Sequence, residues 1–112
     1  MKATHDATVM SGDELVRALS ALANPHRLRI LAILSVDRMY VSQLAREIRL
    51  SRPLVHMHLQ KLEAAGLVTG HLELSEEDGK AMKFFEVTPF ALTLTPQSIA
   101  LAVRTLTGGD ER

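Results

Sequence analysis

Residues 41–68 have the sequence VSQLAREIRLSRPLVHMHLQKLEAAGLV. Its apolar residues recur at helical spacing in two segments, and the pattern predicts one helix over about residues 43–49 and a second over about residues 52–65. Ser42 and Ser51 precede these segments, and serine is a good N-cap because its hydroxyl accepts a hydrogen bond from an amide of the first turn. The stretch therefore predicts two capped helices joined by a tight turn.

The hydrophobic period changes after the second helix. Gly66 stands where a helix end needs a left-handed residue. Residues 67–74 and 82–88 then alternate apolar and polar side chains around a turn that contains glycine, which predicts a β-hairpin. Phe84 and Phe85 point to opposite sides of the second strand, so one is expected in the core and the other on the body or in an interface. The expected fold is α+β, mainly α: a winged helix-turn-helix with a two-stranded hairpin wing.

Further helices flank this motif. Ser11 and Glu14 have the spacing of a capping box, and Asn24 followed by Pro25 is typical of a helix start. Thr95, with a proline after it, opens a last helix. The second helix is apolar almost all round and is expected at the centre of the core. The expected flanking elements are helices at about residues 12–23, 25–35 and 96–107, a short strand at 39–41 and an extended stretch at 90–94.

Length and composition exclude several classes of protein. A chain of 112 residues, 46% of them hydrophobic, builds one core, and we expect a flexible segment over residues 1–10, one domain over 11–107 and a tail over 108–112. The chain has no cysteine, which excludes disulfides and thiol nucleophiles. Its first residues lack the apolar core of a signal peptide, and no stretch reaches the length of a membrane span. These features predict a cytoplasmic protein with no membrane partner.

The net charge is zero, but the charges are unevenly distributed. Residues 17–61 contain eight basic and two acidic side chains, whereas residues 63–88 contain two basic and six acidic ones. A basic helical half is what binding to nucleic-acid phosphates requires. The hairpin half is acidic, with Glu-Glu-Asp at residues 76–78, so phosphate should repel its tip.

The second helix of the motif has an apolar back and a polar front, as a helix in a DNA major groove about 12 Å wide requires. Val55, Leu59 and Leu62 form the back, and the front lies on the opposite side of the helix. The expected DNA contacts, from this front, the preceding helix and the hairpin, are Ser42, Gln43, Arg46, Arg49, Ser51, Arg52, Pro53, His56, Met57, Gln60, Lys61, Lys80 and Lys83.

These contacts are expected to divide into two kinds. Arg52, His56 and Gln60 can donate hydrogen bonds to base edges. Met57 is the apolar residue of the front, and it either meets a thymine methyl group or is simply exposed. Phosphate contacts are expected from Ser51, Arg46, Arg49 and Lys61.

The other polar candidates leave alternatives open. His56 and His58 are two positions apart and point about 200° apart on a helix, so one metal ion cannot easily join them. His58 is expected to be packed and hydrogen-bonded at the inward edge, and His71 to be solvated, as is His5. Arg27 is either part of a solvated face or a phosphate contact. We expect no metal site and no cofactor.

The combination of ALANPHRLRILAIL, residues 21–34, with residues 41–68 resembles the ArsR-type winged-helix transcriptional regulators. The resemblance covers about residues 15–90 and implies a dimeric DNA-binding repressor whose first and last helices form the dimer interface. The sequence departs from the family in two ways. It has no residues that match the metal-sensing sites described for the family, and it has no arginines at the wing tip. The implied interface residues are Leu15, Leu19, Leu22, Ile99, Ala102, Val103 and Leu106.

The leading hypothesis is a homodimeric, sequence-specific regulator, most simply a repressor, of double-stranded DNA with a pseudo-palindromic operator. The acidic wing and zero net charge motivate an alternative, a winged-helix protein–protein interaction module with weak or no DNA binding. A steep loss of DNA binding with rising salt separates the two. An enzyme is disfavoured because the sequence has no cysteine nucleophile, glycine-rich phosphate loop or paired-carboxylate motif. The effector is left open.

Overall fold

The computed structural model describes residues 10–74 and 78–108; the predicted hairpin tip and most of the predicted terminal segments lie outside these residues. The longest described helix has 13 residues, and none within these two ranges is long and apolar enough to cross a membrane. In chain order the elements are α2 (Gly12–Leu22), α3 (Pro25–Leu34), β1 (Met39–Tyr40), α4 (Val41–Ile48), α5 (Arg52–Ala64), β2 (Val68–Leu74), β3 (Ala81–Val87) and α6 (Pro96–Val103).

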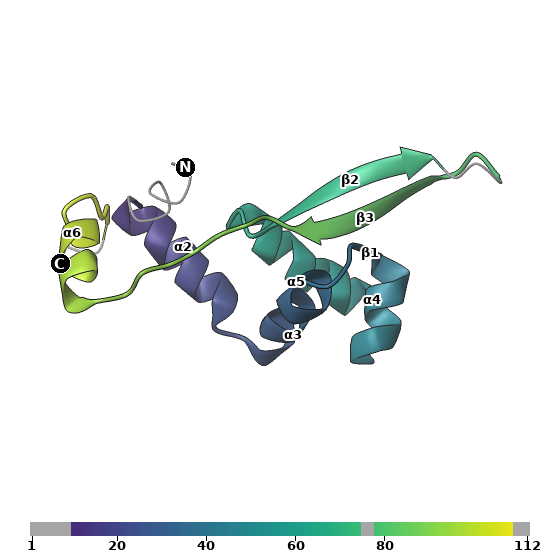
Figure 1. Cartoon of the computed structure of the whole chain (residues 1–112), viewed down its shortest axis with the longest axis horizontal. Helices are drawn as coiled ribbons and strands as arrows, with labels where there is room; N and C mark the ends of the chain where they lie inside the picture. The colour runs from purple at the N-terminus through teal and green to yellow at the C-terminus, as the bar shows by residue number, and fades with distance from the viewer. Residues whose placement is uncertain (1–9, 75–77, 109–112) are drawn as a thin grey trace.

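The core lies between the helices α3, α4 and α5 and the base of the hairpin. Ile30 of α3 and Leu44 of α4 are fully buried there, together with the predicted apolar back of α5. Phe85 of β3 closes the core from the sheet side. In Figure 1 the hairpin projects from this body at one end, and α2 and α6 lie at the other. The prediction that α3 lies at the centre is confirmed.

Local hydrogen bonds explain where most helices begin. The Ser11 hydroxyl accepts from the Glu14 amide at 3.1 Å, and the Glu14 carboxylate accepts from the Ser11 amide at 3.0 Å, so the predicted capping box is confirmed. The Asn24 side chain caps α3 in the same manner. The Ser51 hydroxyl accepts from the Leu54 amide at 3.3 Å and fixes the start of α5.

The helix α4 begins two residues earlier than predicted. Its N-cap position is Tyr40, so the prediction that Ser42 is the cap is wrong. The physical reason is that Gln43, three residues after Tyr40, accepts from the Tyr40 amide at 2.8 Å, as the N3 side chain of a capping box does, and this bond fixes the first turn at Val41. The helix therefore starts at Val41, directly after β1.

The last helix is shorter than predicted. It ends at Val103, because the amides of Arg104, Thr105 and Leu106 bond to carbonyls three residues back, in tighter turns than those of an α-helix. Leu106 thus lies beyond α6. Residues 88–95 contain no helix or strand and lead the chain along the body to α6 (Figure 1).

The predicted hairpin is confirmed, and a third strand extends it. β2 pairs antiparallel with β3, and β1 pairs with the other edge of β3, which gives the order β1-β3-β2. Met39 lies opposite Phe85, and Tyr40 lies opposite Phe84. Both phenylalanines are buried, Phe85 in the core and Phe84 against the side chains at the base of the wing. The three-stranded sheet therefore joins the wing to the helical body.

Candidate nucleic-acid interface

A sharp turn between α4 and α5 sets the geometry of the helix-turn-helix. Arg49 ends α4 in the left-handed region, with φ 60°, and its amide donates to the Ala45 carbonyl. The Leu50 amide donates to the same carbonyl at 3.1 Å. This conformation is usually taken by glycine and is strained for arginine. The turn thus places an arginine side chain directly before the N-terminus of α5.

α5 has the two faces that the sequence predicts. Its buried residues are Val55, His58, Leu59 and Leu62. The predicted front of α5 is exposed, and its residues are Arg52, Pro53, His56, Met57, Gln60 and Lys61. His56 is exposed and His58 is buried, so the two imidazoles lie on opposite sides of the helix. The described residues also include no group of three or more metal-ligating side chains placed to hold an ion.

The residues of α4 are unequal in their exposure. Arg46, Arg49 and Gln43 are exposed, whereas Ser42 is half-buried. The side-chain oxygen Oε1 of Gln43 already accepts a hydrogen bond from the Tyr40 amide, so only the side-chain NH₂ group of Gln43 is left to bond to a ligand. Within residues 10–74 and 78–108, no carboxylate lies within ion-pair distance of Arg46, Arg49 or Arg52. These guanidinium groups are therefore available to phosphates.

The lysines of the wing are exposed, but they are not equally free. The Lys83 ammonium lies 5.3 Å from the centroid of the Phe85 ring. Its side chain crosses Gly70, where a Cβ atom would lie 2.9 Å from the Phe85 ring. At the described end of the hairpin, the Asp78 carboxylate accepts from the Lys80 amide at 3.0 Å. The wing thus holds Lys83 against its own surface and keeps a carboxylate beside Lys80.

A polar cluster that the sequence did not reveal fixes the base of the wing. The Arg38 guanidinium lies 3.8 Å above the Phe84 ring and 3.4 Å from a Glu73 carboxylate oxygen. The Tyr40 hydroxyl donates to the same carboxylate at 3.1 Å, and this bond raises the pKa of Tyr40. His71, predicted to be solvated, is stacked on Phe84 at 5.3 Å. The cluster ties the hairpin to the strand that precedes α4.

A second polar cluster lies behind α5. The Arg27 Nε donates to the Ala21 carbonyl at 2.7 Å, and its Nη1 donates to Nδ1 of His58 at 3.1 Å. His58 must be neutral to accept this bond, and burial, assisted by the Arg27 and His26 charges, lowers the pKa of His58. The prediction of a packed, hydrogen-bonded His58 is confirmed. The hypothesis of a solvated Arg27 is wrong, because its side chain is only 9% exposed.

The sequence did contain a signal for this burial. Arg27 precedes the buried residues Ile30, Leu31 and Leu34 by three, four and seven positions, which places all four on one side of α3. A charged residue at a core position indicates a buried partner, and that partner, His58, lies 31 positions away.

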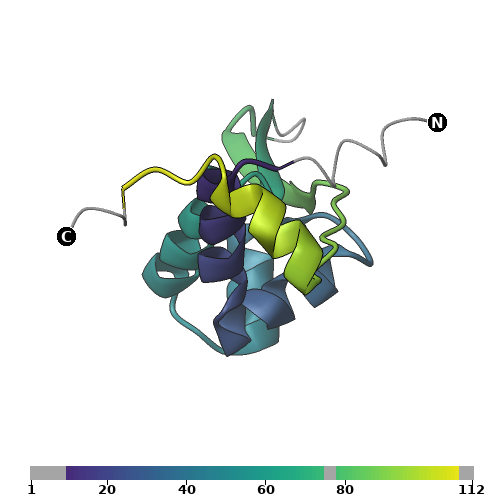
Figure 2. The ribbon, with the colours of Figure 1, turned by 90° about the vertical axis from the view of Figure 1, so that its left-hand side faces the viewer.

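Most of the predicted dimer residues lie at the opposite end of the molecule, but Leu22, the last residue of α2, packs against the core. Figure 2 shows α6 lying across α2 at this end. The exposed members of the predicted set are Leu19, Ile99, Val103 and Leu106. Ala102 is buried within the chain, and Leu15 and Leu22 are half-buried. Val16 and Leu101, which the prediction did not include, are 51% and 62% exposed.

The packing of α6 on α2 depends on the first turn of α2. A Cβ atom at Gly12 would lie 2.8 Å from Cβ of Leu106, so the absence of a side chain permits the close approach. The Gly12 amide donates to the Thr105 hydroxyl at 2.8 Å. The amide and hydroxyl of Thr107 donate to the Asp13 carboxylate, and these bonds lower the pKa of Asp13. The two terminal helices are thereby held as one unit.

The buried back of α5, its exposed front and the adjoining hairpin define a winged helix-turn-helix regulator. The model of the bacterial regulatory protein arsR family matches residues 24–69, from the cap of α3 to the start of β2. An uncharacterized HTH-type transcriptional regulator of Methanocaldococcus jannaschii is 40% identical over 77 residues, which cover 69% of this chain and 79% of that protein. The chain belongs to the ArsR family of transcriptional regulators, which bind DNA through this motif.

Solved structures share the fold. A homodimeric winged helix-turn-helix DNA-binding domain from Mycobacterium bovis, a possible ArsR-family regulator, has a TM-score of 0.57 and 22% identity, covering 82% of this chain and 74% of that one. The transcriptional repressor BigR from Xylella fastidiosa has a TM-score of 0.56 and 20% identity, covering 82% of this chain and 79% of that one.

Proposed function

We propose that the chain is a homodimeric repressor that acts in the cytoplasm on a pseudo-palindromic operator in double-stranded DNA. Two copies of α5 would enter successive major grooves about 34 Å apart. The observation that carries this proposal is the division of α5 into a fully buried apolar back and an exposed polar front, beside arginines that have no carboxylate partner in the described residues.

The exposed residues of α5 suit two tasks. Arg52, His56 and Gln60 follow one another at intervals of four residues, so they form one row along the helix, and they would read base edges. Arg46 and Arg49 stand beside the N-terminus of α5 and would hold the phosphates that flank the groove. The Ser51 hydroxyl accepts from the Leu54 amide, which leaves its own proton free for a phosphate oxygen.

Several observations support a homodimer. The helices α2 and α6 lie at the end of the molecule opposite the hairpin (Figure 1), and both carry exposed apolar side chains. The domain from Mycobacterium bovis with the same fold is homodimeric. A second copy would cover the apolar residues of both protomers through a two-fold interface.

The same proposed geometry supports a repressor role. A dimer that fills two successive major grooves excludes other proteins from that DNA, which is the simplest route to regulation. BigR, whose fold is the same, is a transcriptional repressor.

The test is fluorescence anisotropy with a labelled duplex from the region upstream of the protein's own coding sequence, beside a shuffled duplex, at several salt concentrations. We expect tight, salt-sensitive binding to the native duplex that Arg52→Ala weakens. If the protein binds neither duplex, or binds both equally and without salt dependence, the alternative of a protein-interaction module is preferred.

A further inference from the structure

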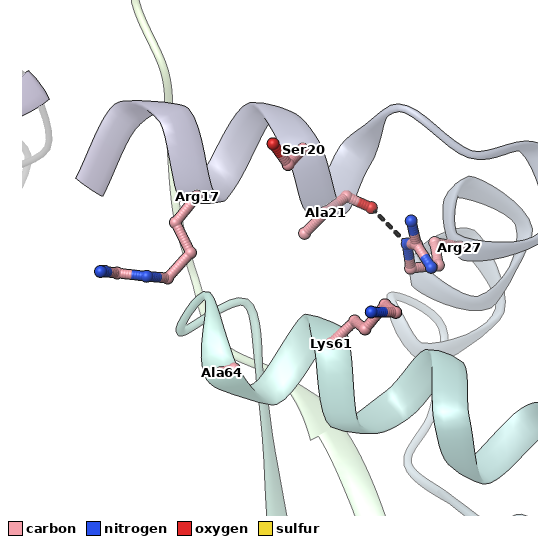
Figure 3. A pocket seen from close by; sticks show the side chains of 6 residues that line it. All are labelled: Arg17, Ser20, Ala21, Arg27, Lys61 and Ala64. Carbon is pink, nitrogen blue, oxygen red and sulfur yellow. Dashed lines mark hydrogen bonds between the residues drawn. The ribbon is translucent and has the colours of Figure 1, made fainter. Parts of the chain in front are cut away.

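A cleft of about 480 Å³ opens between α2, α3 and α5, at the edge of the exposed front of α5, to which Lys61 also belongs. It is lined by Arg17, Ser20, Ala21, Arg27, Lys61 and Ala64 (Figure 3). Half of these residues are cations, and none of them is acidic. The two alanines and the serine are small, so they leave the space between α2 and α5 unfilled.

Arg27 is a buried cation whose protein partners are neutral. It is nine-tenths buried, and its guanidinium bonds to a backbone carbonyl and to neutral His58. No carboxylate lies within ion-pair distance of it in the described part of the chain. A buried arginine is rarely left without a counter-charge, because desolvation of the cation is costly. Its two hydrogen bonds hold the guanidinium fixed at one end of the cleft.

The other two cations add to this positive charge. Figure 3 shows the Lys61 side chain reaching toward Arg27, while Arg17 stands at the far end of the cleft. Neither of them forms an ion pair within residues 10–74 and 78–108. Neighbouring cations raise the free energy of the folded chain unless an anion lies between them. Guanidinium and ammonium groups are the side chains that bind phosphate and sulfate oxygens best.

We propose that this cleft binds a small, doubly charged oxyanion: phosphate, sulfate or the phosphate group of a phosphorylated metabolite. Arg27 would supply the fixed donor, Lys61 would close on the anion beside it, and Arg17, whose guanidinium points outward in Figure 3, would turn inward from the far end of the cleft. Because Lys61 belongs to α5, the bound anion would join the recognition helix to α2 and α3. Two kinds of ligand carry such a group: a free oxyanion and the DNA backbone, through one of its phosphates.

The test is a titration of the ¹⁵N-labelled full chain, without DNA, with sodium phosphate at constant ionic strength, followed by NMR chemical shifts. We expect saturable shifts of amides around the cleft that equivalent chloride does not produce. Lys61→Gln and Arg17→Gln, both at exposed positions, should each weaken phosphate binding at least about fivefold. The control variant Arg29→Gln removes an exposed cation of α3 outside the cleft and should bind phosphate like the unmodified chain.

The absence of saturable phosphate-specific shifts would overturn the proposal, as would equal affinities of Lys61→Gln, Arg17→Gln and the unmodified chain. A second titration, with operator duplex added, separates the two kinds of ligand. Release of phosphate on duplex addition assigns the cleft to a backbone phosphate, and retention assigns it to a free oxyanion. The first titration contains no DNA, so its result is independent of the proposed repressor function.

Discussion

α5 and α6 both present an exposed face, but the two faces are made of different residues. On α5 the exposed residues are mostly polar or charged, and the apolar ones are buried beneath. On α6 the exposed residues include Leu101 and Val103, which are 62% and 54% exposed, while only Ala102 is buried. An exposed polar face suits a hydrated, charged surface such as DNA, whereas an exposed apolar face gains free energy when a protein covers it.

Among the substitutions considered, the largest change in free energy is expected where α5 meets the core. Leu59 is fully buried, so Leu59→Ala should lower the free energy of unfolding by about 2–5 kcal/mol. Ile99→Ala, at an exposed position of α6, should cost the single chain far less. Urea denaturation at several protein concentrations measures both. Equal losses, independent of concentration, would contradict the contrast between the two helices.

The next effect is expected at the proposed dimer interface. Val103→Glu places a charge in an apolar contact and should raise the dimer dissociation constant at least about thirtyfold, as the loss of a central interface residue does. Leu72→Glu is the matched control, because Leu72 is an exposed apolar residue of the wing. Sedimentation equilibrium measures both variants. A dimer that tolerates Val103→Glu but not Leu72→Glu would move the interface to the wing.

A smaller effect is expected on the DNA-binding face. Arg52→Ala or Gln60→Ala should each weaken specific binding by about 1–3 kcal/mol. Lys83→Ala should have a smaller effect, because the Lys83 ammonium lies against Phe85 within the wing. Anisotropy titrations on the native duplex compare the three variants. If Lys83→Ala has the largest effect, the wing rather than α5 dominates recognition.

The smallest effect concerns pH. Burial lowers the pKa of His58 below its usual value near 6.5, so the unfolded chain takes up a proton more readily than the folded one. The free energy of unfolding should therefore be constant well above pH 6.5 and decrease as the pH falls below it. His58→Gln can still accept from Arg27 and should reduce this decrease. An equal pH dependence in both proteins, measured by urea denaturation, would exclude His58 as its source.

Periodicity predicted the two faces of α5 because they depend on spacing within a single helix. The serine cap at Ser51 and the left-handed glycine at Gly66, with φ 78°, were predictable for the same reason. The start of α4 was not, because the Gln43 side chain accepts from the Tyr40 amide and places the N-cap at Tyr40, two residues before the serine that was expected to cap the helix.

The errors at the candidate site arise from contacts between distant segments. Arg27 is buried because its partner His58 is supplied by another helix. Ala102 was expected at the dimer interface, but the missing side chain at Gly12 lets α2 approach it, so it is buried within the chain. The burial of Arg27 could be inferred from its spacing within α3, but the partner of either contact could not, because it lies on another element.

Hydroxyl-radical footprinting on the native duplex reports where each copy of α5 lies on the DNA. We expect two protected half-sites, one helical turn or about 10 base pairs apart, that Arg52→Ala weakens together. A single protected segment, or protection that Arg52→Ala leaves unchanged, would contradict a homodimer that reads DNA with α5.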